Sequence, residues 1–339
     1  MKIRDFSFNL PPEQIAQHPP EERGTAKLMV MNRQTGEISH KNMQDFPDLV
    51  EPGTLVVFNN SRVRKARVFA FSEHGGKVEF FFLKSLEKDL WLCMVSKAKK
   101  QKAGKKFTFP GDVDGVIEEE VSSNHRKVRF SMPVDDDYLD VHGHIPLPPY
   151  IKREDSEEDS ERYQSVFSKE TGSVAAPTAS LHFTDEILGR LKDKGVETAF
   201  VTLHVGLGTF EPVRTESILD HKMHEEQFFI SDDTADKIEK ALKEGRPVLA
   251  VGTTSVRTLE SAWQDGKLTR GENATNIFIY PGYDFKVVSQ MFTNFHTPES
   301  TLLVLVSAFA GKDYIDAAYS EAVEKGYMFF SYGDAMLMK

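Results

Sequence analysis

The sequence predicts an α/β protein in which a smaller antiparallel β-barrel interrupts a larger mixed α/β domain. Three observations support this fold class. The 339 residues exceed the size at which a single hydrophobic core usually stops growing. Residues 63–131 show short alternating apolar runs between turn-forming glycines and prolines, without helical periodicity. After about residue 163, strand-like runs alternate with helical ones.

Five or six short runs at hairpin spacing predict the strands of the small barrel or sandwich: KARVFAF, KVEFFFL, LWLCMV, KKFTF, GVIEEE and KVRFSM. We assign residues 62–149 to this inserted β-barrel domain. Residues 1–61 and 150–339 then form one discontinuous catalytic α/β domain. The segment HGHIPLPPYI after the barrel is rigid and rich in proline, and REDSEEDSER is expected to be a polar, acidic link.

The larger domain is predicted from two kinds of run, those with the two-residue alternation of strands and those with the periodicity of helices. Strands are expected for KLMVMNRQTGEISH, GTLVVFNNS, TAFVTLHV, PVLAVG, NIFIYPGY and STLLVLVSAFAG. Helices are expected for TADKIEKALKEG and TSVRTLESAWQDG, with a short one for AYSEAVEKG. The alternation of the two classes indicates a layered α/β arrangement.

Composition predicts a cytoplasmic protein. Cys93 is the only cysteine, which excludes a disulfide framework and a zinc site built on several thiolates. The first twenty residues carry charges and prolines where a signal peptide needs an apolar stretch. The longest apolar run, 302–310, is too short for a membrane span, which needs about 20 residues.

Charge is distributed unevenly along the chain. The formal net charge is −10, yet residues 62–110 carry 13 Lys and Arg against 4 Asp and Glu, a local balance of +9. The excess peaks in six lysines within ten residues: Lys97, Lys99, Lys100, Lys102, Lys105 and Lys106. These lysines form either a basic face for an anionic polymer or a solvated hairpin tip, and both interpretations stay open.

A strand followed by glycine and hydroxyl residues at a helix start predicts an anion site. In Pro247-Val-Leu-Ala-Val-Gly-Thr-Thr-Ser-Val-Arg257, unpaired backbone N–H groups and the positive end of the helix dipole face one point. A carboxylate or a phosphate is the natural ligand. The alternative is ordinary helix capping with no ligand.

Histidines gather in the second half of the chain, at His182, His204, His221, His224 and His296. A neutral imidazole with a pKa near 6.5 can accept or donate a proton at cellular pH, so these residues are candidates for acid and base steps. For each one alone, a hydrogen-bonded structural role is the alternative. The spacing of His221 and His224 departs from the His-Glu-x-x-His pattern, so no metal site is predicted.

Glycine-rich segments exclude some cofactors and suggest a stacking surface. Gly206-Leu-Gly208 lacks the third glycine of a dinucleotide fingerprint, and no Walker A sequence is present. Nicotinamide cofactors and nucleoside triphosphates therefore lose their usual sequence support. Tyr280-Pro-Gly-Tyr283 and Ser331-Tyr-Gly-Asp334 place aromatics beside glycine, which suits either stacking on a base or an ordinary turn.

Seven blocks, in order along the chain, resemble one known family. They are Phe58-Asn-Asn-Ser-Arg-Val63, Ser173-Val-Ala-Ala-Pro-Thr-Ala-Ser-Leu-His-Phe-Thr184, Val201-Thr-Leu-His-Val-Gly-Leu-Gly-Thr-Phe210, Gly252-Thr-Thr-Ser-Val-Arg-Thr-Leu-Glu-Ser261, Ile279-Tyr-Pro-Gly-Tyr283, Thr293-Asn-Phe-His296 and Phe330-Ser-Tyr-Gly-Asp-Ala335. These blocks are similar to the signatures of the S-adenosylmethionine:tRNA ribosyltransferase-isomerases of queuosine biosynthesis. The resemblance covers nearly the whole chain and is weakest in the basic β region and the acidic link.

Several positions depart from the pattern of that family. Ser180 stands where the family usually has Gly, Asn60 where Asp is frequent, and Glu225 where Ser is common. Thr297-Pro-Glu299 replaces the usual Leu-Pro-Lys. None of these changes removes a histidine, an arginine or the Thr-Thr-Ser turn.

The resemblance implies an unusual use of S-adenosylmethionine, as a consumed donor of a rearranged ribose. The acceptor would be the aminomethyl group of preQ1 at the wobble position, 34, of certain tRNAs, and the products epoxyqueuosine-tRNA, adenine and methionine. It also implies a barrel inserted in an α/β domain. Such chemistry needs a base beside the sulfonium carbon, an acid for the departing adenine and exclusion of water, and it needs neither a metal nor a redox cofactor.

We accordingly predict three groups of site residues. The catalytic candidates are His182, His204, His296 and Asp334, with His182 and His204 ranked above His296. The substrate-binding candidates are Arg62, Thr178, Gly206, Gly208, Thr253, Thr254, Ser255, Arg257, Tyr283, Asn294 and Tyr332. The tRNA-binding candidates are the six lysines. The expected partners are S-adenosylmethionine and preQ1-containing tRNA, for a monomer without membrane contact. A non-catalytic tRNA-binding protein and an S-adenosylmethionine-dependent RNA methyltransferase are the alternatives.

Overall fold

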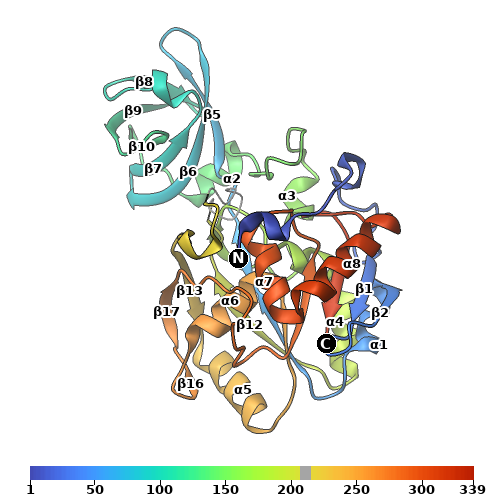
Figure 1. Cartoon of the computed structure of the whole chain (residues 1–339). Helices are drawn as coiled ribbons and strands as arrows, with labels where there is room; N and C mark the ends of the chain where they lie inside the picture. Colours follow the sequence, from blue (N-terminus) through green and yellow to red (C-terminus); the bar gives the residue numbers. More distant parts are fainter. Residues whose placement is uncertain (207–214) are drawn as a thin grey trace.

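The computed structural model, which describes residues 1–206 and 215–339, has the architecture expected from the sequence. A large mixed sheet with helices on both faces carries a closed, six-stranded antiparallel barrel (Figure 1). The predicted fold class is therefore confirmed. The predicted boundaries at residues 62 and 149 stay predictions, and the six barrel strands all lie between them.

The large sheet has nine strands in the order β17-β13-β12-β3-β14-β18-β19-β1-β2. Its central strands β12, β3, β14 and β18 run parallel, whereas antiparallel pairs are found on both sides of them. The strands are β1 (Lys27–Met31), β2 (Ile38–Asn42), β3 (Leu55–Asn59), β12 (Glu197–Leu203), β13 (Glu226–Ile230), β14 (Val248–Val251), β17 (Gly271–Thr275), β18 (Gln290–Asn294) and β19 (Ala335–Met338).

Side chains on successive residues of these strands enter two different cores. In β3, Val57 belongs to a core shared with α5 (Asp232–Lys243), α6 (Gly252–Ala262), α7 (Thr301–Ala310) and α8 (Lys312–Glu324). Its neighbours Val56 and Phe58 face the other core, with α1 (Phe46–Leu49) and α4 (Asp185–Asp193). Successive side chains of a strand point to opposite faces of the sheet, so these almost uninterrupted apolar runs bury both faces. The result is a domain of three layers, with the sheet between two layers of helices.

The barrel strands coincide with the six runs expected from the sequence. They are β5 (Arg67–Ser72), β6 (Lys77–Glu87), β7 (Leu90–Val95), β8 (Lys106–Phe109), β9 (Val113–Glu120) and β10 (His125–Phe130). The order β10-β7-β6-β5-β8-β9 closes on itself, so the barrel has no free edge. Phe80, Phe82 and Phe109 fill its interior.

Two short strands join the barrel to the larger domain. β4 (Ser61–Val63) leads into the barrel and pairs in parallel with β11 (Glu170–Ser173), which follows the return of the chain. Helix α2 (Asp136–His142) lies at the base of the barrel, where Asp136 forms an ion pair with Arg64. The barrel is thus held to the α/β domain by contacts on both of its connections.

The acidic segment after the barrel, expected from the sequence to be a polar link, is mostly exposed or half-buried but places one carboxylate in the interior. It contains α3 (Asp159–Arg162), and Asp159 is 1% exposed. The Asp159 carboxylate accepts hydrogen bonds from Arg153 and from the hydroxyl of Tyr332. A buried carboxylate is tolerated here because charged and polar donors surround it.

Two other predicted elements were wrong, and a third, the helix now labelled α6, was predicted too long. The run STLLVLVSAFAG forms helix α7, because Ser300 caps it and α8 and the sheet cover an apolar surface that extends almost all round it. A short apolar run does not distinguish a buried strand from a buried helix. NIFIYPGY has no strand, since the edge strand β17 ends just before it at Thr275. The helix predicted over residues 254–266 ends at Ala262, and the hairpin β15 (Trp263–Gln264) and β16 (Lys267–Leu268) follows.

Among the residues that the structure describes, no helix combines the length and the apolar character needed to cross a membrane.

Candidate functional site

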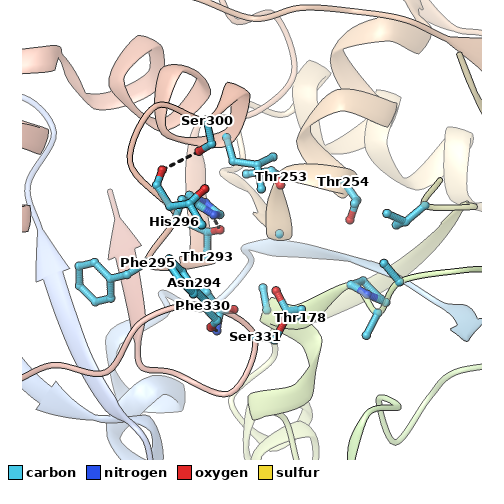
Figure 2. A pocket seen from close by; sticks show the side chains of 18 of the residues that line it. Thr178, Thr253, Thr254, Thr293, Asn294, Phe295, His296, Ser300, Phe330 and Ser331 are labelled. Atoms are coloured by element: carbon cyan, nitrogen blue, oxygen red, sulfur yellow. Dashed lines mark hydrogen bonds between the residues drawn. The ribbon is translucent and has the colours of Figure 1, made fainter. Parts of the chain in front are cut away.

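A cavity of about 360 Å³ lies at the carboxyl ends of three parallel strands of the large sheet (Figure 2). Val205 follows β12, Gly252 follows β14 and Asn294 ends β18, and all three line the cavity. β12 and β14 lie on opposite sides of β3, so the order in which strands are added to the sheet reverses at β3, next to the cavity. Open α/β sheets bind their ligands at such a switch point.

The first turn of α6 faces this cavity. The chain passes from β14 into the helix at Gly252, whose φ of +84° strains any residue with a side chain. The N-cap residue of α6, Val251, makes no side-chain capping hydrogen bond. Thr253 and Thr254 line the cavity, and the buried Thr254 Oγ1 has no hydrogen-bond partner in residues 1–206 and 215–339. Free N–H groups, the positive end of the helix dipole and an unpaired hydroxyl therefore face the same space.

A second helix also begins at the cavity. Ser300 caps α7, accepting a hydrogen bond of 3.1 Å from the backbone N–H of Leu303, while its own hydroxyl donates to Thr297 O. Ser300, Thr301 and Leu302 line the cavity. Two positive helix ends thus border one space, an arrangement that favours a negatively charged group of a ligand.

Figure 2 places Asn294, Phe330 and Ser331 across the cavity from Thr253 and Ser300. The Asn294 amide nitrogen donates to Phe330 O at 2.9 Å and to His182 Nε2 at 3.1 Å. His182 itself does not line the cavity and is 6% exposed. Its burial lowers its pKa to about 4, so its imidazole is neutral at cellular pH.

His296 is the one of the three ranked histidines that lines the cavity, although it was ranked last from the sequence. Its Nε2 lies 3.1 Å from the hydroxyl of Thr293, and its backbone N–H donates to the hydroxyl of Tyr319. Burial lowers the pKa of His296 to about 3, so it too is neutral near pH 7. Of the described residues lining the cavity, His296 is the only imidazole and Glu299 the only carboxylate.

His204 lies just after β12, next to a lining residue but not itself in the cavity. Its ring is close enough to Gly172 that a Cβ there would stand 2.6 Å from Nδ1. Nδ1 is buried and has no hydrogen-bond partner in the described part of the chain. Burial, and then the positive charge of Arg64, lower the pKa of His204. The structure thus places His204 at the junction with the barrel.

Three predicted polar groups are held by structural partners outside the cavity. The carboxylate of Asp334 accepts hydrogen bonds from the backbone N–H groups of Lys27 and Met328, at 2.7 and 2.8 Å. The Tyr332 hydroxyl donates to Asp159 at 2.7 Å. The Tyr283 hydroxyl donates to the buried Glu260, which also accepts three backbone N–H groups. Each of these side chains fastens one segment of the chain to another.

The end of the predicted anion motif points away from the cavity. Ser255 is fully buried, and its hydroxyl donates to Val251 O within its own helix. Arg257 forms a buried ion pair with Glu226, whose other oxygen accepts from the backbone N–H of Gly206 at 3.1 Å. Burial lowers the pKa of Arg257 to about 10. The structure therefore separates Ser255 and Arg257 from Thr253 and Thr254.

The remaining predicted substrate ligands fall in different places. Thr178 lines the cavity, on the short helical turn that ends at His182. Arg62 is exposed on β4, outside the cavity. Gly208 lies outside the described residues.

Sequence reasoning missed several polar groups of the cavity. Ser300 and Thr301 were overlooked because the apolar run after them was interpreted as a strand. Read as a helix, the same run has Ser at the N-cap, which is a recognisable signal. Tyr150 and Ser331 also line the cavity, and their hydroxyls share a hydrogen bond of 2.5 Å. No local pattern marks Tyr150, which comes from the proline-rich segment after the barrel.

The six lysines lie at the end of the barrel that is remote from the α/β domain. β7 runs away from that domain and β8 returns, so the loop between them belongs to the outer end, together with the β5–β6 turn (Figure 1). Lys102 forms an ion pair with Glu120 at 3.0 Å, and Lys105 donates to Gln101 at 2.8 Å. The other four are exposed and make no ion pair with the described residues: Lys97, Lys99, Lys100 and Lys106.

Comparison with known proteins gives consistent matches over the full chain. Residues 3–338 match the family described as "Queuosine biosynthesis protein". An S-adenosylmethionine:tRNA ribosyltransferase-isomerase from Treponema denticola is 51% identical, and one from Clostridioides difficile 50% identical, each aligned over 100% of both chains. The solved structure of an S-adenosylmethionine tRNA ribosyltransferase from Thermotoga maritima is 36% identical, with a TM-score of 0.57, over 99% of this chain and 100% of that one.

Proposed function

Because the chain belongs to the S-adenosylmethionine:tRNA ribosyltransferase-isomerase family, we propose that it transfers and isomerises the ribosyl part of S-adenosylmethionine onto preQ1 at the wobble position of tRNA. Adenine and methionine are released, and epoxyqueuosine-tRNA is formed. One observation of the molecule carries this proposal. The cavity at the switch point of the sheet is bordered by two helix N-termini and by polar atoms of Thr254 and Asn294 that have no hydrogen-bond partner among the described residues.

The methionine carboxylate of S-adenosylmethionine binds at the first turn of α6 in this proposal. Backbone N–H groups at Thr253 and Thr254 donate to it, and the Thr254 hydroxyl supplies a further donor. A carboxylate is favoured there because the start of α7 adds a second positive helix end. Arg257 acts indirectly, since its guanidinium is paired with Glu226.

The proton transfers are assigned to groups that reach the cavity. The reaction removes a proton from the carbon next to the sulfonium and delivers one to the departing adenine. His296 is the proposed base for the first of these steps, because a neutral imidazole can accept a proton and this one lines the cavity. Glu299, the lining carboxylate, is the proposed alternative base. His182, His204 and Asp334 support the site from outside it.

The tRNA is proposed to contact the outer end of the barrel as well as the cavity. Four exposed lysines that form no ion pair with any described residue give that end a positive surface, which suits the phosphate backbone. We expect the enzyme to act as a cytoplasmic monomer and to need no metal or redox cofactor.

The decisive experiment incubates the protein with S-adenosylmethionine and preQ1-containing tRNA and identifies the small products. Release of adenine and methionine supports the proposal. Release of S-adenosylhomocysteine identifies a methyltransferase instead, and binding of tRNA without any product identifies a non-catalytic binding protein. The matched control is the same tRNA with guanine at the wobble position, because it lacks the aminomethyl acceptor and is expected to give no modified tRNA.

A further inference from the structure

The side-chain amide of Asn294 is fixed in one orientation. Phe330 O only accepts hydrogen bonds, so the amide group at 2.9 Å from it must be the nitrogen. The same nitrogen donates its second hydrogen to His182 Nε2, at 3.1 Å. Both amide hydrogens are therefore used by the protein. The amide oxygen is buried and has no hydrogen-bond partner among the residues that the structure describes, on a residue that is 2% exposed and lines the cavity.

His182 determines this orientation without reaching the cavity itself. To accept a hydrogen bond at Nε2, its imidazole must carry its proton on Nδ1 and be neutral. Its burial, which lowers its pKa to about 4, keeps it neutral at cellular pH. If the amide of Asn294 were turned over, its oxygen would face two acceptors, His182 Nε2 and Phe330 O. The two hydrogen bonds of the amide nitrogen therefore point Asn294 Oδ1 away from His182 and from Phe330 O.

We propose that Asn294 Oδ1 is a fixed acceptor for a neutral N–H or O–H of the adenosine part of S-adenosylmethionine, and that His182 is the positioning residue that holds it. A buried acceptor without a partner costs free energy, which a ligand recovers when it supplies a donor. This inference rests on the proposed function, since it names the group of the donor substrate that one side chain reads.

The donor is a neutral group of the nucleoside because of the charges around the cavity. A buried ammonium ion needs a carboxylate for compensation, and Asn294 offers only an uncharged oxygen. The lining carboxylate, Glu299, is exposed, and two positive helix ends border the cavity. The adenine amino group and the ribose hydroxyls are the neutral donors of adenosine.

The test measures competition with S-adenosylmethionine by four probes: adenosine, inosine, 2′-deoxyadenosine and 3′-deoxyadenosine. In the wild-type protein, the analogue that lacks the donor read by Asn294 should bind roughly ten- to a hundredfold more weakly than adenosine. Inosine identifies the adenine amino group, and the two deoxynucleosides identify a ribose hydroxyl. In Asn294→Leu the four nucleosides should bind with similar affinities, because the leucine side chain has no hydrogen-bond acceptor.

His182 is tested by two substitutions that differ in hydrogen bonding. In His182→Gln the side-chain oxygen can still accept from Asn294, so discrimination among the nucleosides should be largely retained. His182→Phe offers no acceptor and should reduce the discrimination towards that of Asn294→Leu. A purely structural His182 would lower the stability of both variants and leave the affinity ratios unchanged. Because the readout is a ratio within one variant, partial unfolding does not imitate it.

The inference and the proposed function fail in different ways. If wild-type protein binds S-adenosylmethionine and releases adenine, the proposed function holds. If wild-type protein then shows no discrimination, or if Asn294→Leu keeps the wild-type ratios, the assignment of Asn294 is overturned. If both His182 variants keep those ratios, the positioning role is overturned. Absence of adenine release from the wild-type protein refutes the proposed function itself.

Discussion

Two buried neutral histidines should make the protein sensitive to mild acid. His182 and His296 have folded pKa values of about 4 and about 3, below the unfolded value of about 6.5. Between these values the unfolded chain binds more protons than the folded one, so stability is fully present above pH 6.5 and is lost as pH falls. Each histidine should lower the free energy of unfolding by about 2 kcal/mol between pH 7 and pH 5, or about 4 kcal/mol together.

Chemical denaturation of the full chain at pH 7, 6 and 5 measures this effect. His182→Gln and His296→Gln remove one titrating group each, so each variant should lose about 2 kcal/mol of the pH dependence, whatever its stability at pH 7. The matched control is His74→Ala, because His74 is exposed in the β5–β6 turn of the barrel. A double Gln variant that keeps the full wild-type decrease between pH 7 and pH 5 refutes the reasoning. The carboxylate of Asp159 does not interfere, since hydrogen bonds from Arg153 and Tyr332 hold its pKa well below this window.

Four further predictions follow from the site. Replacing Lys99 and Lys100 together by alanine should reduce the slope of log affinity for tRNA against log salt concentration by about 1.5. Replacing Lys102 and Lys105 together should reduce that slope less, because these two lysines already have partners within the protein. Equal slopes for the two double variants in a salt titration of tRNA binding contradict this. Thr254→Val should raise the Michaelis constant for S-adenosylmethionine about tenfold or more, while Thr258→Val, whose hydroxyl serves its own helix, should not. His296→Ala should lower single-turnover adenine release by a factor of about 10² to 10⁴ with tRNA saturating, and an unchanged rate assigns the base to Glu299 or to the substrate. Arg257→Ala should lower the free energy of unfolding by about 3 to 5 kcal/mol, because Glu226 loses its buried counter-charge. Adding Glu226→Gln to this variant should recover part of the loss, and chemical denaturation measures both effects.

The sequence predicted the fold class because the relevant signals are local. Six β runs between turn residues correspond to β5 through β10, and the alternation of strands and helices corresponds to the layered domain. The failure at residues 301–310 has a physical cause. A helix that is buried on most sides has no polar face, so its period is hidden and only the cap at Ser300 marks its start.

The candidate site was predicted in part for a related reason. Thr178, Thr253, Thr254, Asn294 and His296 come from three separate segments, and the structure brings all of them to one cavity. Tyr283, Asp334 and Arg257 look equally functional as sequence, but each has a distant partner that uses its polar atoms. A sequence shows which groups can bind a ligand, whereas the fold decides which of them still have free atoms.

The positions of the cavity and of the lysines imply that the lysines contribute to tRNA binding, whereas the cavity residues contribute to the reaction. A six-residue strand such as β5 spans roughly 20 Å, at about 3.3 Å per residue, and the lysine-rich loop lies at its outer end. A nucleotide reacting in the cavity is therefore at least the height of the barrel away from these lysines. Contacts at that distance can strengthen binding of the tRNA but do not touch the reacting atoms. Lysine substitutions should for this reason raise the Michaelis constant for tRNA and leave turnover at saturation unchanged, while changes at Thr254 or His296 act at the site of the reaction.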